Sequence, residues 1–348
     1  TVQLGTGILQ INSDITIDGD IYSNGIAGIS LDAENTSGFL LIQGGDVNLR
    51  NLVFETADND IGGAIRINST TADVEITGSF FKGNTALQGG AIRNDGSDLT
   101  VWNSTFFNNV ASYAMGNSGS GIGGAIATVG GTTTLINSTF KQNIAGQTGD
   151  AGFAGSLAAA NFQSSTGVGG VDLAGTTTFD NSILAAFPGT YTGIPANTPG
   201  SVIAATAADA GLATFLYTGS GVPAFTLSAD SPAIGAGNAN LLPPDTFDFD
   251  FDGDTSEDVS TDSFGSARQI GALDAGATED NQIVVVDSLG DTDDEDYSEG
   301  NVTLREALSL VAPNGTIVFD ADITTGTTAG VDDGVSTLAE GELALFQN

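Results

Sequence analysis

Carboxylates alternate with other residues along residues 248–254, and this spacing suits the binding of a hard cation. Carboxylates two residues apart on a tight turn can converge on one ion, and Gly253 permits the bend. The acid expected at the twelfth position of an EF-hand loop is replaced by Val259, although Glu257, Asp258 or Asp262 could substitute for it. A solvated acidic loop is the alternative. The predicted calcium ligands are Asp248, Asp250, Asp252, Asp254 and Asp258.

A second acidic run, residues 287–296, is the other candidate calcium site. Residues 245–306 hold 19 of the 43 carboxylates of the chain, against Arg268 and Arg305. A charge run without regular spacing is commonly a solvated surface, so calcium and a solubilising role both stay open. The candidate ligands in this run are Asp291, Asp293 and Asp294, with Asp287 and Asp296 beside them.

Residue types that catalyse reactions are scarce. The chain has no His and no Cys, which excludes imidazole general-base catalysis, thiol chemistry and the usual zinc sites. The best enzyme hypothesis is a polysaccharide lyase or hydrolase that uses Arg66 and Arg93, which follow two Gly-Gly-Ala-Ile motifs and would stack. Such a pair more often forms a surface ladder with nearby Asp. We therefore predict that the protein is not an enzyme.

The net charge of −36, with only seven basic residues, bears on the partners of the protein. Nucleic acid and anionic membrane surfaces would repel it. No apolar run approaches the roughly 20 residues of a membrane span. The charge predicts a soluble surface or one that binds cations, with no nucleic acid partner and no membrane insertion.

The elements that must position these residues come from a repeat of nine alternating polar and apolar residues. It covers residues 46–54, 73–81, 98–106 and 132–140, and more weakly 14–22 and 176–184. Three copies precede a Gly-Gly-Ala-Ile motif, and the two tightest repeats are 27 and 25 residues long. The ninth position is Tyr22, Phe54, Phe81, Phe106, Phe140 and Leu184, and the sixth is Gly19, Asn51, Gly78, Asn103, Asn137 and Asn181.

A period of about 25 residues with strand alternation is too short for a propeller blade and predicts one coil of a solenoid. We expect an all-β, right-handed parallel β-helix, since parallel β-crossovers are right-handed. Coils would stack about 4.8 Å apart, so the Phe column fills the core. The Asn or Gly column would mark a left-handed turn, and Gly-Gly-Ala a corner for small residues.

The pairing of Gly-Gly-Ala-Ile with Phe-x-x-Asn, across roughly residues 50–145, resembles the repeats of chlamydial polymorphic outer-membrane proteins and related bacterial adhesins. Residues 230–237 (DSPAIGAG) and 268–274 (RQIGALD) resemble the end of secreted β-helix domains, with Gly235 in place of the usual Asp. This resemblance implies a secreted protein that is extracellular or on the bacterial cell surface.

Residues 301–308 (NVTLREAL), followed by 314–320 (NGTIVFD), look like the segment that starts many such β-helices. Thr303 and Glu306 fit a capping box, which predicts a short capping helix near 303–311. Such a segment should precede a β-helix rather than follow one. Residues 337–348 align without gaps to residues 1–12, with identities at Thr1, Gly5, Leu9 and Asn12. The sequence therefore predicts just over one period of a tandem repeat.

The predicted organisation is β-helix coils in 1–200, a C-terminal end with the acidic loop in 201–280, and the cap and first strands of the next repeat in 281–348. The predicted function is structural: a calcium-stiffened repeat unit of an extracellular fibre, matrix or adhesin, whose partners are adjacent copies arranged head to tail. The alternative is an adhesin module that binds a surface ligand or glycan through inserted loops 111–122 and 144–170.

Overall fold

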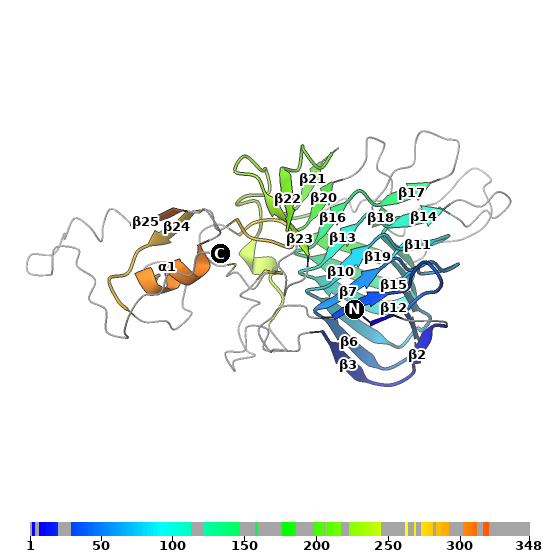
Figure 1. Cartoon of the computed structure of the whole chain (residues 1–348). Coiled ribbons are helices and arrows are strands. Elements are labelled where there is room, and N and C mark those ends of the chain that lie inside the picture. The colour runs from blue at the N-terminus through cyan, green and yellow to red at the C-terminus, as the bar shows by residue number, and fades with distance from the viewer. Residues whose placement is uncertain are drawn as a thin grey trace, which may run out of the picture.

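Short strands that recur once per repeat build the fold, which is given by a computed structural model (Figure 1). The residues that the structure describes are 2–3, 7–19, 29–112, 121–146, 157–158, 176–185, 198–204, 206–216, 223–244, 262–263, 268, 273–280, 283–291, 302–311 and 316–319.

The first long sheet contains one strand from each repeat, and every strand pairs in parallel with the strand one repeat away. Phe54, Phe81, Phe106 and Phe140 share one register row of this sheet. Its strands, in spatial order, are β1 (Val2–Gln3), β4 (Ile29–Asp32), β7 (Leu52–Glu55), β10 (Phe80–Lys82), β13 (Thr105–Phe107), β16 (Thr139–Lys141), β20 (Ile183–Ala185) and β21 (Val202–Ala204).

The second long sheet is also parallel and has two runs of strands that merge. Its first run is β2 (Leu9–Ile11), β5 (Leu40–Ile42), β8 (Ile65–Ile67), β12 (Ile92–Trp102), β15 (Ile126–Ile136) and β18 (Leu157–Ala158). The other run is β3 (Ile15–Asp18), β6 (Asp46–Arg50), β9 (Asp73–Thr77) and β19 (Thr176–Asp180). β12 and β15 have 11 residues each and join both runs, whereas the sequence predicted only short strands.

Smaller elements complete the chain. A third parallel sheet contains β11 (Thr85–Ala86), β14 (Val110–Ser112) and β17 (Ile144–Gly146). β22 (Leu212–Leu216) and β23 (Ala224–Leu227) form an antiparallel pair, followed by a 3-10 helix at Ala239–Leu241. β24 (Ile283–Val286) and β25 (Thr316–Phe319) pair in parallel, with helix α1 (Leu304–Leu310) between them in sequence. The prediction of an all-β fold with parallel sheets is therefore confirmed. We call β1 to β21 the coil stack.

The core of the coil stack is a column of rings. The rings of Phe54, Phe81, Phe106 and Phe140 are fully buried, and their centroids are 4.7–4.8 Å apart at interplanar angles of 10° or less. This spacing equals the separation of paired strands, so like residues lie on like residues. The Phe column that the sequence predicted is confirmed.

The turn and corner positions also follow the sequence. Asn51, Gly78, Asn103, Asn137 and Asn181 all have φ between 45° and 52°, the left-handed conformation that Asn and Gly tolerate. At the corner, a Cβ on the second glycine would have no room. On Gly63 it would lie 2.0 Å from the carbonyl oxygen of Gly90, and on Gly90 2.0 Å from that of Gly124.

The predicted capping box is present at the start of α1. The Thr303 hydroxyl accepts from the backbone N–H of Glu306, and the Glu306 carboxylate accepts from the backbone N–H of Thr303 at 2.8 Å. Around α1 lies a small core of its own, made of Val284, Val286, Val302 and Ala307.

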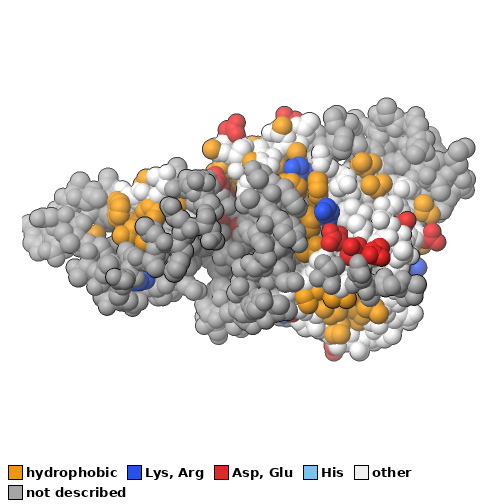
Figure 2. Space-filling model, in the orientation of Figure 1, with side chains coloured by type: hydrophobic (Ala, Val, Ile, Leu, Met, Phe, Trp, Pro, Cys, Tyr) orange, Lys and Arg blue, Asp and Glu red, His pale blue; other side chains and the backbone are white. Residues whose placement is uncertain are grey.

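Hydrophobic side chains are visible at several places on the face shown in Figure 2, among them the end of the coil stack near β3 and the unit of β24, α1 and β25. Five of the seven large hydrophobic residues that are exposed in the described part of the chain lie on β1, β2, β3 or β25. The five are Val2, Leu9, Ile15, Val318 and Phe319, and the other two are Ile203 and Ile234.

Candidate functional site

Two ladders of polar side chains run through the coil stack beside the Phe column. In the first, Asn84, Asn109 and Asn143 are fully buried. The Nδ2 of Asn84 donates to the Oδ1 of Asn109 at 2.9 Å, and Asn109 donates to Asn143 at 2.8 Å. Each Nδ2 also donates to a backbone carbonyl of the preceding coil, such as that of Phe54 for Asn84. These bonds tie each coil to both neighbours.

The second ladder is made of serines. The backbone N–H of Ser79 donates to the Oγ of Ser104 at 3.1 Å, and Ser104, Ser138 and Ser182 repeat this contact with the next serine, ending at Ser201. The Asn of Phe-x-x-Asn stood out in the sequence as part of a motif, whereas the serines were not predicted. The signal was present, because Ser follows the turn residue in four of the repeats.

A segment from the C-terminal part of the chain closes against the coil stack, and we call its described residues, 262–263, 268 and 273–280, the closing segment. The backbone N–H of Gly276 donates to the carbonyl of Asn181 at 2.7 Å. That of Ala277 donates to the hydroxyl of Thr139 at 3.0 Å. These two contacts tie the closing segment to two successive coils.

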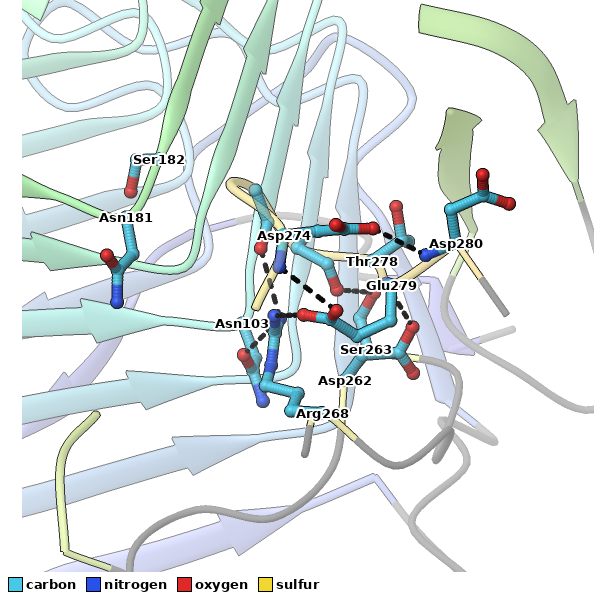
Figure 3. Close-up of polar contacts among 12 residues, drawn as sticks. Asn103, Asn181, Ser182, Asp262, Ser263, Arg268, Asp274, Thr278, Glu279 and Asp280 are labelled. Atoms are coloured by element: carbon cyan, nitrogen blue, oxygen red, sulfur yellow. Dashed lines mark hydrogen bonds and ion pairs between the residues drawn. The ribbon is translucent and has the colours of Figure 1, made fainter. Parts of the chain in front are cut away.

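Arg268 anchors the closing segment (Figure 3). Its side chain is fully buried and pairs with the carboxylate of Glu279 at 2.6 Å. It also donates to the Oδ1 of Asn103 at 2.8 Å and to the carbonyl of Gly276 at 3.0 Å. A buried guanidinium is costly unless it is paired and hydrogen-bonded, and here three acceptors surround it.

Carboxylates crowd around this ion pair. The backbone N–H of Asp274 donates to Glu279, and that of Glu279 donates to Asp262 at 2.8 Å. The pKa of Glu279 is raised to about 8, mainly by burial and also by the neighbouring carboxylates of Asp274 and Asp262, although the Arg268 guanidinium lowers it. Burial also raises the pKa of Asp274. The folded protein therefore favours the protonated forms of Glu279 and Asp274 more than the unfolded chain does.

The two motifs that resemble the end of secreted β-helix domains meet at the closing segment. The backbone N–H of Gly235, which has φ of 65°, donates to the carboxylate of Asp274 at 2.7 Å. The backbone N–H of Gly237 donates to the carbonyl of Leu273, also at 2.7 Å. Asp274 thus stabilises the turn of the other motif, which gives the pairing of the two motifs a physical basis.

The predicted metal ligands are only partly within the described residues. Asp248, Asp250, Asp252, Asp254 and Asp258 lie outside them, as do Asp293 and Asp294. Most of the inserted loops 111–122 and 144–170, together with the aligned stretch 337–348, also lies outside them. Calcium binding by these residues stays a prediction.

Asp291 is one of the candidate ligands that the structure describes, and its carboxylate contacts a cationic side chain. Both of its oxygens accept from Arg305, at 2.9 and 3.0 Å, and its side chain is only 4% exposed. Nearby, the carboxylate of Asp287 accepts from the backbone N–H of Val302 at 2.8 Å. Within the described ranges, no three Asp or Glu side chains come together closely enough to hold a metal ion.

Arg66 and Arg93 lie in register on β8 and β12, as their place after the corner motif predicted. Both form ion pairs with the carboxylate of Asp95, and the Nε of Arg66 lies 3.0 Å from its Oδ2. The two arginines therefore form a ladder with Asp, the alternative to a glycan site that the sequence left open.

Three like charges form a second surface row. Asp46, Asp73 and Asp98 are in register on β6, β9 and β12. Partial burial raises the pKa of Asp73, and the neighbouring Asp46 and Asp98 raise it further. Like charges directly opposite one another destabilise a sheet, so this row costs stability.

Asn137 is the exception in the turn column. Its side chain is fully buried, and neither its Oδ1 nor its Nδ2 has a hydrogen-bond partner among the described residues. In contrast, Asn103 accepts from Arg268, and Asn181 accepts from the backbone N–H of Asn238 at 2.8 Å. The backbone conformation alone accounts for Asn at position 137.

Comparison with known proteins adds no assignment, because no protein-family model and no curated protein matches the chain. No helix among the described residues is long and apolar enough to span a membrane.

Proposed function

We propose that the chain folds as a right-handed parallel β-helix and serves as a structural repeat unit of a bacterial extracellular fibre, matrix or cell-surface adhesin. The observation that carries the proposal is the continuity of the ladders. Ring stacking and buried Asn and Ser hydrogen bonds connect one coil to the next. Bending the stack would break several of these contacts at once, so the unit resists bending.

The closing segment supports the same proposal. The closing segment contacts residues that are far away in the sequence. Arg268 contacts Asn103, 165 positions away, and Gly276 contacts Asn181. This clamp holds adjacent coils together from outside, where the ladders hold them from inside. In this proposal the adjacent copies of the repeat lie head to tail, and calcium binds the acidic loop at 248–258 near the junction.

The proposal is tested by shape and by location. Small-angle X-ray scattering should give an elongated particle, in which each coil contributes about 4.8 Å to the length. Antibodies against the chain should label the outside of intact cells of the source organism in electron micrographs. A compact particle, or labelling confined to the cell interior, would contradict a role as an extracellular rod.

A further inference from the structure

The first coil has inward-facing hydrophobic residues that stay largely exposed, with no described residue covering them. Leu9 pairs with Leu40, and Ile15 with Val47, and both partners are buried inside the coil stack. Leu9 and Ile15 point to the same side of the sheet as these partners, since they share their register rows. They are nevertheless 53% and 42% exposed.

The unit of β24, α1 and β25 also has a hydrophobic side chain that is exposed although it points toward the core. Phe319 of β25 lies in register with Val286, which is 1% exposed. Phe319 therefore points toward the side that α1 covers, yet it is 49% exposed. A two-stranded sheet is marginally stable by itself, and β24 is the only strand that pairs with β25 among the described residues.

The sequence indicates which strand belongs beside β25. Residues 337–348 repeat the pattern of residues 1–12, so the counterpart of Leu9 is Leu345. Leu345 comes 28 residues after Ile317. Paired strands of successive coils are 31 residues apart from β2 to β5 and 25 from β5 to β8. The counterpart of β2 thus follows β25 by one coil.

We propose that β25 of one copy pairs in parallel with β2 of a second copy of this chain, with Ile317, Val318 and Phe319 opposite Leu9, Gln10 and Ile11. The pairing places Ile317 and Phe319 over Leu9 and Ile11, which joins the small core around α1 to the core of the coil stack. It rests on the proposed function and names the contact between copies.

Such an interface uses different surfaces on the two copies. A heterologous contact that does not close on itself generates open chains rather than a closed dimer. The same pairing would form between consecutive copies on one polypeptide. The two open strand edges, which would otherwise favour aggregation, then cover each other.

The absence of cysteine allows a site-specific test. Val318 and Gln10 point away from the core in this pairing, and paired strands bring their Cα atoms within the range of a disulfide. We would mix the single variants Val318→Cys and Gln10→Cys of the full chain, with different mass tags, under mild oxidation. Ile234→Cys is the matched control, since Ile234 is 38% exposed and lies on neither element.

The proposal predicts a mixed disulfide between positions 318 and 10 that forms at least tenfold faster than one between positions 318 and 234. Equal rates would overturn it. Rod-like scattering from both variants would then leave the proposed function standing, so the two failures can be told apart.

A second measurement tests the association of variants in which either β2 or β25 is altered. Leu9→Lys should block one face and Phe319→Lys the other, so each variant alone should sediment as a monomer in analytical ultracentrifugation. An equimolar mixture retains one intact pair of faces and should form dimers and nothing larger. The control Ile234→Lys should associate as the unaltered chain does. Association by either single variant would contradict the pairing.

Discussion

Asn103 and Asn137 occupy the same position of successive coils, yet their amide groups differ in what they contact. Both have the left-handed backbone that the turn requires. Only Asn103 also accepts a hydrogen bond from the buried guanidinium of Arg268. At this scale the site is one cation and its acceptors, and each acceptor can be tested separately.

Replacement by Gly keeps the backbone conformation and removes the amide. Asn103→Gly should lower the free energy of unfolding by about 1.5–3 kcal/mol, because a buried charged donor loses an acceptor. Asn137→Gly should cost less than Asn103→Gly, because its amide makes no bond among the described residues. Chemical denaturation of both variants measures the difference. Equal losses would mean that Arg268 does not depend on Asn103.

The pKa of Glu279 predicts how stability depends on pH. Because the folded state raises this pKa from 4.5 to about 8, it binds the proton more tightly than the unfolded state does. The contribution to stability is complete below about pH 4.5 and is lost as pH rises through about 8. The melting temperature should fall across this window, and Glu279→Gln should flatten that part of the profile. Asp230→Asn, which removes a carboxylate at an exposed position, is the matched control.

At the scale of elements, the corners decide how closely coils can approach. Gly90 has an ordinary backbone conformation, but a Cβ there would lie 2.0 Å from a carbonyl oxygen of the next coil. Gly83 has φ of 64° and nothing within 4 Å of an added Cβ. The two glycines are therefore required for different reasons, one for space and one for conformation.

Alanine substitutions separate these two reasons. Gly83→Ala should cost about 1–2 kcal/mol of unfolding free energy, the penalty for a left-handed non-glycine residue. Gly90→Ala should cost about 3 kcal/mol or more, because the backbone of two coils must move apart. Thermal and denaturant unfolding would give both values. A smaller loss at Gly90 than at Gly83 would show that the corner has room to relax.

At the scale of the whole molecule, the chain has a net charge of −36. Its fold places equivalent residues of successive coils next to one another, so like charges come close together. Self-repulsion at this charge destabilises a compact state unless counterions reduce it. The row of Asp46, Asp73 and Asp98 is a local example of this repulsion, because Asp46 and Asp98 raise the pKa of Asp73. Calcium bound at the acidic loop would reduce this repulsion.

Calcium should raise the melting temperature of the protein, and a chelator should reverse the change, since a ligand that binds only the folded state stabilises it. The double variant Asp250→Asn with Asp252→Asn should lose this response. Asp46→Asn with Asp73→Asn removes the same charge elsewhere and should keep it. Identical melting with calcium and with chelator would mean that the acidic stretch only solubilises the surface.

Much of the fold was determined by the sequence itself. Strand alternation, the Phe column and the left-handed positions such as Asn51 could be predicted because they depend on local periodicity and on the φ angles that a residue tolerates. The capping box of α1 was predictable for the same reason, since Thr303 and Glu306 are three residues apart. Each of these features is repeated or short-range, so the sequence alone contains its signal.

Only the tertiary structure decided which polar residues meet. The contact of Arg268 with Asn103 joins positions 165 residues apart, and no local pattern indicates it. The same holds for Asp291, predicted as a metal ligand, whose two oxygens contact Arg305. The cost of burying a charge depends on every group around it, and the fold brings those groups together from distant parts of the chain.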